Sequence, residues 1–181
     1  EVLNKNRNLK RMVVVEGYTD VLSLFSNDIS YAVATLGIAT SKNHLEKLFS
    51  HVDEVIFCFD GDEAGMKAAE SAMKIALPII RDGRILKFLF LPDSEDPSSL
   101  LEKEGKEQFE KRIDSSKVLS EYLFEIILNK YDETLENKAA AAKEFLGLIS
   151  SMPSSNYKNI LIQEFSKKAV SYTHLRAHET L

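Results

Sequence analysis

The feature that most constrains how this chain can fold is a regular alternation of two kinds of segment between Arg11 and Pro92. Four short runs are rich in β-branched and aromatic residues, as buried strands are: MVVVEG, YAVATLG, EVIFCFD and ILKFLFLP. Apolar residues recur at the three-to-four spacing of amphipathic helices in the segments between them: YTDVLSLFSN, TSKNHLEKLFSHV and DEAGMKAAESAMKIALPIIRDG. The order βαβαβαβ predicts a parallel sheet flanked by helices, with right-handed crossovers.

Downstream of Leu91 the pattern changes to the loop PDSEDPSS and then to the charge-rich helical segment LLEKEGKEQFEKRI. From Ser116 onward only helical segments remain: KVLSEYLFEIILNKY, ENKAAAAKEFLGLISSM and SSNYKNILIQEFSKKA. Their apolar stripes have the spacing of core residues, and we assign them to packing. The sequence therefore predicts an α/β domain over residues 11–113 and a small all-helical subdomain over residues 114–170.

The two ends of the chain differ in composition from the residues between them. Residues 1–10 are a polar, basic run without an initial methionine, and we expect them to be the end of a truncated upstream domain. Residues 171–181, SYTHLRAHETL, resemble a segment left by cloning or processing and are expected to be non-native. The alternative for this tail is a metal-binding pair, because His174 and His178 have i, i+4 spacing.

Composition excludes several classes of protein. An ordinary apolar content over 181 residues excludes a disordered or fibrous chain. The single cysteine, Cys58, excludes a disulfide framework or a cysteine zinc site built from this chain. Apolar runs fall short of the roughly 18 residues of a membrane span, so we expect a cytoplasmic protein. The net charge of −5 argues against strong nucleic-acid binding by this chain alone.

Acidic residues follow three of the four predicted strands: Glu16 after the first, Asp60 and Asp62 after the third, and Asp93, Glu95 and Asp96 after the fourth. The carboxyl ends of parallel strands meet at one edge of a sheet, where such folds bind ligands. Converging carboxylates repel each other unless a cation neutralises them. Hard oxygen ligands without thiolate favour Mg²⁺ or Mn²⁺. The sequence therefore predicts a divalent-metal site.

The local spacing supports this site. In Asp60-Gly61-Asp62 the two side chains are expected on one side of a tight turn, and Gly65 is expected to let a ligand approach the helix start. Asp20, four residues after Glu16, is expected to face the same cleft. Each motif alone is also typical of a turn or a helix cap, with Thr40 or Ser41 and Asp60 or Asp62 as capping candidates. Only the joint placement of the three acidic motifs after separate strands favours a metal site over ordinary turns and helix caps.

These residues resemble the signature of the Toprim domain, a glutamate after the first strand and Asp-x-Asp after the third. Within that superfamily VVVEGYTDV, YAVATLG, FCFDGDEAGMKAA and FLFLPDSEDPSSLLEKEG closely resemble the DnaG-type bacterial primases, from about Lys10 to Arg112. The resemblance implies metal ligands at Glu16, Asp60 and Asp62 and further active-site acids at Asp20 and Asp96. Where many primases have Asp-Pro-Asp, this chain has Asp96, Pro97 and Ser98, and Ser98 is expected to coordinate through water.

The resemblance implies a catalytic-core fragment of a DNA-directed RNA polymerase, a nucleotidyltransferase that makes short RNA primers from ribonucleoside triphosphates on single-stranded DNA during replication. It implies Mg²⁺ or Mn²⁺ at the acids, and zinc only in an upstream domain outside this chain. It also implies a primosome partner, the replicative helicase, bound through a C-terminal domain outside this chain, and a place at the bacterial replisome or nucleoid. The fragment is expected to be inactive alone.

Several basic residues are the local candidates for phosphate contacts, with solvated surface charge as the alternative: Lys10, Arg11, Lys67 and Arg84, together with Arg7, Arg81 and Lys87. Cys58 is expected in the core. His44 and His51, seven residues apart on one predicted helix, are expected at the surface.

Three other functions fit parts of the pattern. Another Toprim enzyme, a metal-dependent nuclease or a topoisomerase, would use the same acids. A topoisomerase also needs a nucleophilic tyrosine, and no sequence feature singles out Tyr122, Tyr131 or Tyr157 for that role. A haloacid-dehalogenase-like phosphohydrolase would attack phosphate with Asp60, although that motif usually follows the first strand. A non-catalytic binding domain would retain the acids without using them.

Overall fold

The computed structural model describes residues 9–35, 41–132 and 134–171, with side chains as far as residue 169. The chain divides into two compact units. Of the described residues, an α/β unit contains those up to Ala76 together with Gly83–Leu119, and a helical unit contains Leu77–Asp82 together with those from Ser120 onward. The capping candidate Thr40 and the tail from residue 172 onward, with its two histidines, lie outside the described residues.

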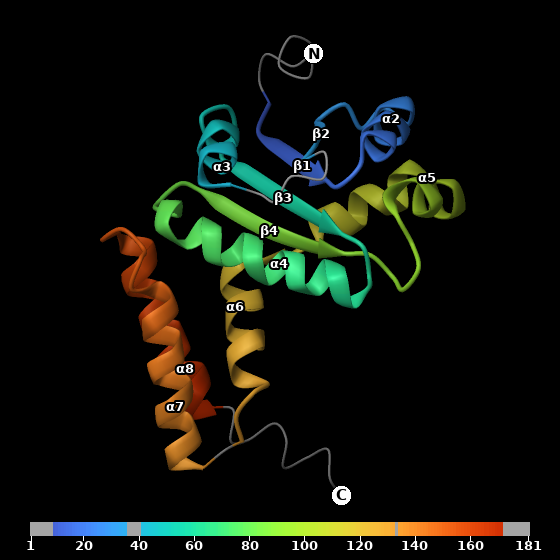
Figure 1. Ribbon diagram of the computed structural model, residues 1–181. Helices are drawn as coiled ribbons and strands as arrows, with labels where there is room; N and C mark the ends of the chain where they lie inside the picture. Colours follow the sequence, from blue (N-terminus) through green and yellow to red (C-terminus); the bar gives the residue numbers. More distant parts are fainter. Residues whose placement is uncertain (1–8, 36–40, 133, 172–181) are drawn as a thin grey trace, which may run out of the picture. The chain divides into compact units, whose positions relative to one another are not determined.

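The α/β unit is built around strands that match the four predicted ones (Figure 1). Its elements are β1 (Arg11–Val15), α2 (Tyr18–Ser26), β2 (Ala32–Ala34), α3 (Lys42–Phe49), β3 (Glu54–Phe59), α4 (Glu63–Ala76), β4 (Ile85–Phe90), α5 (Pro97–Asp114) and β5 (Lys117–Val118). The described residues form a five-stranded sheet in the order β2-β1-β3-β4-β5. The predicted parallel sheet flanked by helices is confirmed.

The strand register places neighbouring carboxyl ends side by side. Val14 pairs with Phe57 and Phe57 pairs with Phe88, so β1, β3 and β4 run in parallel through the centre of the sheet. The edge strand β5 is antiparallel, with Val118 opposite Lys87. The sequence placed this dipeptide at the start of a helix, because two residues are too few to show strand periodicity.

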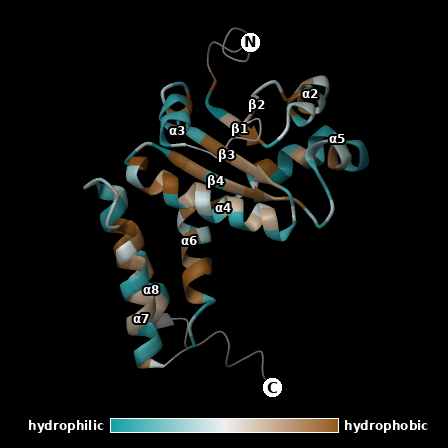
Figure 2. Ribbon diagram, in the orientation of Figure 1, coloured by the Kyte–Doolittle hydropathy of each residue, from teal (hydrophilic) through white to brown (hydrophobic). Residues whose placement is uncertain are grey.

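Each face of the sheet has its own apolar core, because successive residues of a strand point to opposite faces. On one face Ile56 and Cys58 pack with Leu24 of α2 and Phe109 of α5. The opposite face carries an aromatic stack of Phe57, Phe59, Phe88 and Phe90, with ring centroids 5.7 to 6.5 Å apart. The strands are accordingly the most continuously apolar ribbons of this unit (Figure 2).

Helix α5 is interrupted at Gly105, which has a φ of 76° and a ψ of 170°. This backbone conformation is outside the helical region and favours glycine, so the predicted helical segment is in fact two helical stretches joined at Gly105. The first stretch begins with a capping box, in which the Asp96 carboxylate accepts the Ser99 N–H at 2.7 Å and Ser99 Oγ accepts the Asp96 N–H at 3.1 Å. The second stretch carries Phe109 into the core.

The segment after α4 belongs to the other unit. We predicted one helix over residues 62–83, but α4 ends at Ala76 and a short 3-10 turn, η1 (Leu77–Ile79), follows it. Pro78 explains the ending, because proline lacks the N–H that a continuing helix needs. Leu77, Ile79 and Ile80 are buried, and by its contacts this segment clusters with the helical unit.

The helical unit contains α6 (Leu119–Leu128), α7 (Leu135–Ile149) and α8 (Asn156–Ser171). Its core is aromatic: Phe145 stacks on Phe165 with ring centroids 4.0 Å apart, and Phe124 lies tilted against both at 6.0 and 5.5 Å. All three side chains are at most 5% exposed. The predicted small helical subdomain is confirmed, and its core is the one that the apolar stripes indicated.

A remote residue caps α8. The carboxylate of Asp82, at the end of the segment that follows η1, accepts the Tyr157 N–H at 2.7 Å and the Asn156 N–H and Nδ2 at 3.2 Å each. The first turn of a helix has N–H groups without intrahelical partners, and an acidic acceptor there also interacts favourably with the helix dipole. Residues 77–82 are therefore an integral part of the helical unit.

We predict that Asp82→Ala lowers the free energy of unfolding of the helical unit by about 1 kcal/mol, the usual cost of losing an N-cap acceptor. Asp82→Asn retains an acceptor oxygen and should recover much of the loss. Asn159→Ala, an exposed change on α8, is the matched control. Thermal unfolding followed by circular dichroism measures the effect, and an unchanged midpoint for Asp82→Ala would contradict the capping role.

Candidate metal centre

The three acidic motifs lie at one edge of the sheet. Glu16 directly follows β1, and Asp60 directly follows β3, which is the neighbouring parallel strand. The loop that leaves β4 runs alongside, because the Leu91 N–H donates to the Phe59 carbonyl at 3.0 Å. The carboxyl edge of the sheet therefore gathers segments that are far apart in the sequence, as the motif positions indicated.

Asp60 is the electrostatic centre of this edge. Burial of its half-buried carboxyl is the first cause that raises its pKa, to about 6 from an ordinary value of 3.8. The other causes are the negative charges of Glu16, Asp20, Asp62 and Asp96. Charges perturb a pKa in this way only over short distances, so the other four predicted acids all lie within electrostatic range of Asp60.

Three of these carboxylates are fixed by the beginnings of helices. Asp62 Oδ1 accepts the Gly65 N–H at 2.7 Å at the start of α4. Asp20 Oδ2 accepts the Gly17 N–H at 3.0 Å at the start of α2, and Asp96 caps α5. Helix N-termini stabilise nearby anions, so each helix partly offsets the cost of crowding these charges together. Of the capping candidates, Asp62 and Ser41 do cap helices.

Glycines allow two close backbone approaches at the site. A Cβ on Gly61 would lie 2.2 Å from the Leu91 carbonyl oxygen, so Gly61 lets the turn after β3 pass against the loop after β4. A Cβ on Gly65 would lie 2.2 Å from the carbonyl oxygen of Asp60. We predicted that Gly65 makes room for a ligand, but the turn's own backbone already requires this glycine.

Ser98 contacts the cluster directly. Its hydroxyl forms a hydrogen bond with the Asp20 carboxylate, and this bond opposes the burial and the Asp96 charge that raise the pKa of Asp20. The water-mediated metal contact that the sequence predicted for Ser98 stays a prediction, and the interaction with Asp20 does not contradict it. A neutral donor therefore stands at a position where an aspartate would add one more charge to the edge.

Glu16 is exposed at the tip of β1. Within the described residues no three acidic, histidine or cysteine side chains are placed tightly enough to hold one ion together. The carboxylates are thus near one another electrostatically without sharing a coordination sphere. The donor set fits a hard divalent cation, because it consists of carboxylate oxygens around an acid whose pKa is raised by burial and by the negative charges of its neighbours.

The predicted phosphate contact at Arg11 has a structural alternative. Its guanidinium donates to Glu110 Oε2 at 2.7 Å, pairs with Asp114, and lies over the Tyr31 ring at 5.1 Å. Arg11 also begins β1, at the end of the strand away from Glu16. These partners tie the start of β1 to the end of α5, so the charge of Arg11 is already engaged within the unit.

The other basic candidates differ in their surroundings. Lys67 Nζ donates to Glu63 at 2.6 Å along the exposed side of α4. The guanidinium of Arg84 lies over the Phe49 ring at 5.2 Å. Lys10 is exposed just before β1. None of these three residues is next to one of the acids in the sequence. Of the three, only Lys67 lies on a helix that an acid of the site caps, since Asp62 caps α4.

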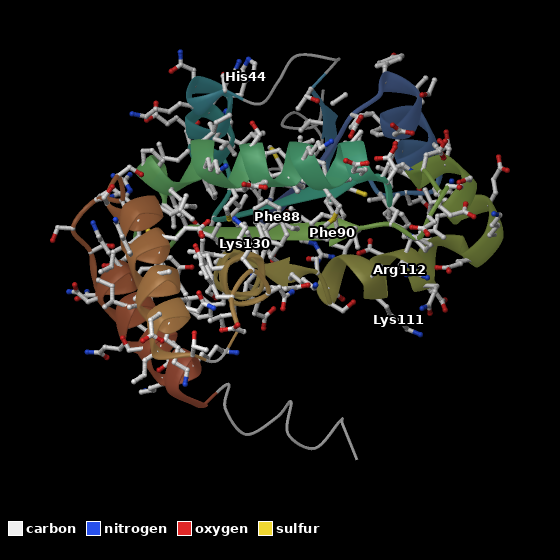
Figure 3. All side chains as sticks on the ribbon, turned by 60° about the horizontal axis from the view of Figure 1, so that its bottom comes forward. His44, Phe88, Phe90, Lys111, Arg112 and Lys130 are labelled. Atoms are coloured by element: carbon white, nitrogen blue, oxygen red, sulfur yellow. The ribbon has the colours of Figure 1, made fainter. Side chains whose placement is uncertain are left out.

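The remaining candidate residues lie where ordinary packing puts them. Cys58 is 3% exposed, and burial raises the pKa of its thiol, so it is a core residue. His44 and His51 are exposed, with His44 on α3 at the outer surface (Figure 3). Tyr122 is 2% exposed, and the Tyr131 hydroxyl donates to Glu144 at 2.9 Å. These positions agree with the predicted core cysteine and surface histidines.

Two protein-family models match the chain. The model described as Toprim-like matches residues 13–101 and includes Glu16, Asp60 and Asp62. The model described as the DnaB-helicase binding domain of primase matches residues 120–169, which include α7 and most of α6 and α8. We expected helicase binding to reside outside this chain, and this match lies inside it.

Individual proteins give the same result. The DNA primase of Pseudomonas aeruginosa is 44% identical over 169 residues, which are 92% of this chain and 26% of that protein. The chain thus spans about a quarter of the length of this relative. A crystal structure of a primase domain from the same species superposes with a TM-score of 0.89 at 44% identity, over 92% of this chain and 53% of that one. A DnaG primase catalytic domain bound to single-stranded DNA gives 0.87 at 43% identity, over 92% and 54%.

We predict that Asp60→Asn stabilises the chain at pH 7 in metal-free buffer. A carboxyl whose pKa is higher in the folded state binds more protons there between about pH 4 and 6, so its ionisation lowers stability as the pH rises through that window. The full shift corresponds to about 3 kcal/mol, and screening by solvent reduces the expected gain to about 1 kcal/mol.

Chemical unfolding at pH 7 and at pH 4 measures this effect, which should nearly vanish at pH 4. The matched control is Asp53→Asn, at an exposed position just before the other end of β3. An Asp60→Asn variant that is less stable than the wild type at pH 7 would show that Asp60 is not repelled by its neighbours.

Proposed function

Because this chain belongs to the DnaG-type DNA primase family, we propose that it is the metal-binding and helical part of a primase catalytic core. In the whole protein it would take part in the template-directed joining of ribonucleoside triphosphates into short RNA primers on single-stranded DNA. The observation that carries this proposal is the group of four carboxylates around Asp60 at the carboxyl edge of a parallel sheet. That edge is the usual ligand site of such folds.

We assign the metal ligands to Glu16, Asp60 and Asp62. Glu16 is exposed at a strand tip, and Asp62 keeps its second carboxylate oxygen clear of the helix cap that Oδ1 makes. Asp20 and Asp96 add their negative charges to the site, and Ser98 holds Asp20 in place by its hydrogen bond. Binding of Mg²⁺ or Mn²⁺ would draw these side chains together, because the cation replaces repulsion between carboxylates by attraction.

Glu16, Asp60 and Asp62 would hold the divalent metal, which when bound would supply polarisation of a phosphate and activation of the attacking 3′-hydroxyl for nucleotidyl transfer. The residues of this chain orient the donor oxygens and keep Asp60 ionised at neutral pH, above its pKa of about 6. A protein nucleophile is not needed for this in-line displacement. The buried thiol of Cys58 and the surface positions of the histidines are compatible with that requirement.

The template and the partners follow from the same family assignment. A DnaG catalytic domain similar to this chain was solved with single-stranded DNA, and we propose that template for the whole protein here. Lys10, Lys67 and Arg84 remain proposed phosphate contacts, and Arg11 a weaker one because its charge is engaged by Glu110. With a net charge of −5, this chain alone would bind DNA weakly and would not prime.

We propose that the helical unit contributes to binding the replicative helicase, since residues 120–169 match a model named for that interaction. Zinc is expected only in a domain upstream of this chain. Across the described residues every helix is too short or too polar to cross a bilayer. The proposed substrates place the whole protein with the replicating chromosome.

We predict saturable Mn²⁺ binding to this chain at pH 7.5 that weakens at pH 5.5. Below its pKa of about 6 Asp60 becomes protonated, and a neutral carboxyl is a poor ligand. Glu16→Gln and Asp60→Asn should each weaken binding by about tenfold or more, whereas Asp53→Asn should not. Electron paramagnetic resonance of free Mn²⁺ measures the titration. Equal Mn²⁺ binding by the wild type and the three variants would contradict the assignment of Glu16 and Asp60 as metal ligands.

For the full-length protein, we predict Mg²⁺-dependent primer synthesis from ribonucleotides on a single-stranded template. Glu16→Gln, Asp60→Asn and Asp62→Asn should each lower the rate by about 100-fold or more, because each removes charge from the metal-binding edge. Primers resolved by gel electrophoresis give the readout, with Asp53→Asn as the control. Metal-dependent nicking of DNA without primers would instead assign the site to a nuclease or a topoisomerase.

A further inference from the structure

The turn between β1 and α2 carries Glu16, one of the proposed metal ligands. On the strand side, Val15 is buried, and its carbonyl accepts the Thr35 N–H at 3.1 Å. On the helix side, Gly17 is the N-cap of α2, and its N–H donates to Asp20 Oδ2 at 3.0 Å. Backbone pairing therefore fixes the residue before Glu16, and the Asp20 side chain fixes the residue after it.

The Asp20 carboxylate lies close against this turn. A Cβ on Gly17 would be 2.8 Å from Asp20 Oδ2, so the carboxylate fills the space beside the Gly17 backbone. An acid at the third helical position that accepts the N–H of the N-cap residue forms half of a capping box, which holds the first turn of the helix together. Glu16 lies directly before this capped turn, so Asp20 helps to determine where the Glu16 backbone is held.

Ser98 binds the same carboxylate from a second helix. Its hydroxyl donates to Asp20, which as an ionised acid is an acceptor only. Helices α2 and α5 lie side by side (Figure 1). Leu24 of α2 and Leu101, three residues after Ser98 in α5, belong to the same buried core. Ser98 therefore stands on an element that is fixed relative to α2, and the Asp20 carboxylate links the turn after β1 to the start of α5.

Both bonds engage Asp20 within the protein. Hydrogen bonds to an ionised carboxylate are stronger than those between neutral groups, so the two donors hold its position firmly. Groups that hydrogen-bond around a metal site and fix the orientation of its ligands commonly contribute tenfold or more to metal affinity without touching the ion. Asp20 has the contacts of such a group, since one of its partners is the backbone directly after the ligand Glu16.

We propose that Asp20 and Ser98 are positioning residues: together they hold the turn after β1 so that Glu16 stays beside Asp60, and Asp20 is not itself a metal ligand. This inference rests on the proposed metal site at Glu16, Asp60 and Asp62. It assigns the importance of Asp20 mainly to the hydrogen bonds that it accepts, and only in smaller part to its negative charge.

Two substitutions of Asp20 separate hydrogen bonding from charge. In an Mn²⁺ titration of this chain at pH 7.5, Asp20→Ala should weaken binding by about tenfold or more, because both bonds are lost. Asp20→Asn has the same shape, and its amide can accept the Gly17 N–H and bond to the Ser98 hydroxyl, so it should weaken binding by no more than about threefold. If Asp20→Asn weakens binding as much as Asp20→Ala, Asp20 acts as a ligand or through its charge, and the inference is wrong.

Substitutions of Ser98 test the second bond. Ser98→Ala should weaken Mn²⁺ binding by about threefold or more, whereas Ser98→Thr retains the hydroxyl and should recover most of the loss. The matched control is Ser26→Ala on the exposed side of α2, where the lost hydroxyl donates only to the Leu22 carbonyl of its own helix, at 2.8 Å. Unchanged affinity in Ser98→Ala would overturn the role of Ser98.

The turn itself can be followed without metal. Hydrogen exchange of the Gly17 amide, measured by NMR on the metal-free chain, should speed up by about threefold or more in Asp20→Ala and in Ser98→Ala, because both changes loosen the bond that protects this amide. Circular dichroism confirms that the variants are folded at the temperature of the titrations. Faster Gly17 exchange together with unchanged Mn²⁺ affinity would show that the pair shapes the turn alone, which overturns the inference.

The outcomes also separate this inference from the proposed function on which it rests. If the wild-type chain does not bind Mn²⁺, or if Glu16→Gln and Asp60→Asn bind it equally well, the proposed metal site fails and the inference fails with it. If those two changes weaken binding while the alanine and asparagine variants of Asp20 bind alike, the metal site stands and only the positioning role is wrong.

Discussion

Parallel pairing of β1, β3 and β4 is the constraint on which the rest of this α/β unit depends. Because the three strands run side by side in the same direction, Glu16 and Asp60 emerge at one edge together with the loop that carries Asp96. The same pairing divides the apolar residues between two faces, so that helices must cover both. One arrangement of the backbone thus supplies both the stability of the unit and the position of its acids.

Crowding carboxylates at that edge is unfavourable, and local structure limits the cost. Asp62, Asp20 and Asp96 each accept a backbone N–H where a helix begins, so three of the five acids have partial compensation. The pKa values of Asp60 and Asp20 are both raised, by burial first and then by the charges of neighbouring acids. Ser98 adds a neutral hydrogen bond where a further charge would raise that repulsion. The site therefore carries excess negative charge, which a divalent cation would neutralise.

Much of the α/β unit and of its acidic edge was predictable from the sequence, since strand periodicity and motif position are local properties. The four predicted strands, the flanking helices and the buried Cys58 are confirmed. The wrong predictions concern elements whose extent depends on other parts of the chain. The helix predicted over residues 62–83 ends at Ala76, and Lys117 and Val118 pair with β4 instead of beginning a helix. Periodicity within a segment does not show which strand or helix it will contact.

By itself the sequence determined the order of strands and helices and the residue types that follow each strand, because hydrophobic periodicity and turn chemistry act over a few residues. Only the tertiary structure decided which groups meet. It joined residues 77–82 to the helical unit, where Asp82 caps α8 from 74 positions away. It also engaged Arg11 with Glu110. Contacts between segments so far apart arise only once the chain has folded, since no local pattern specifies the partner.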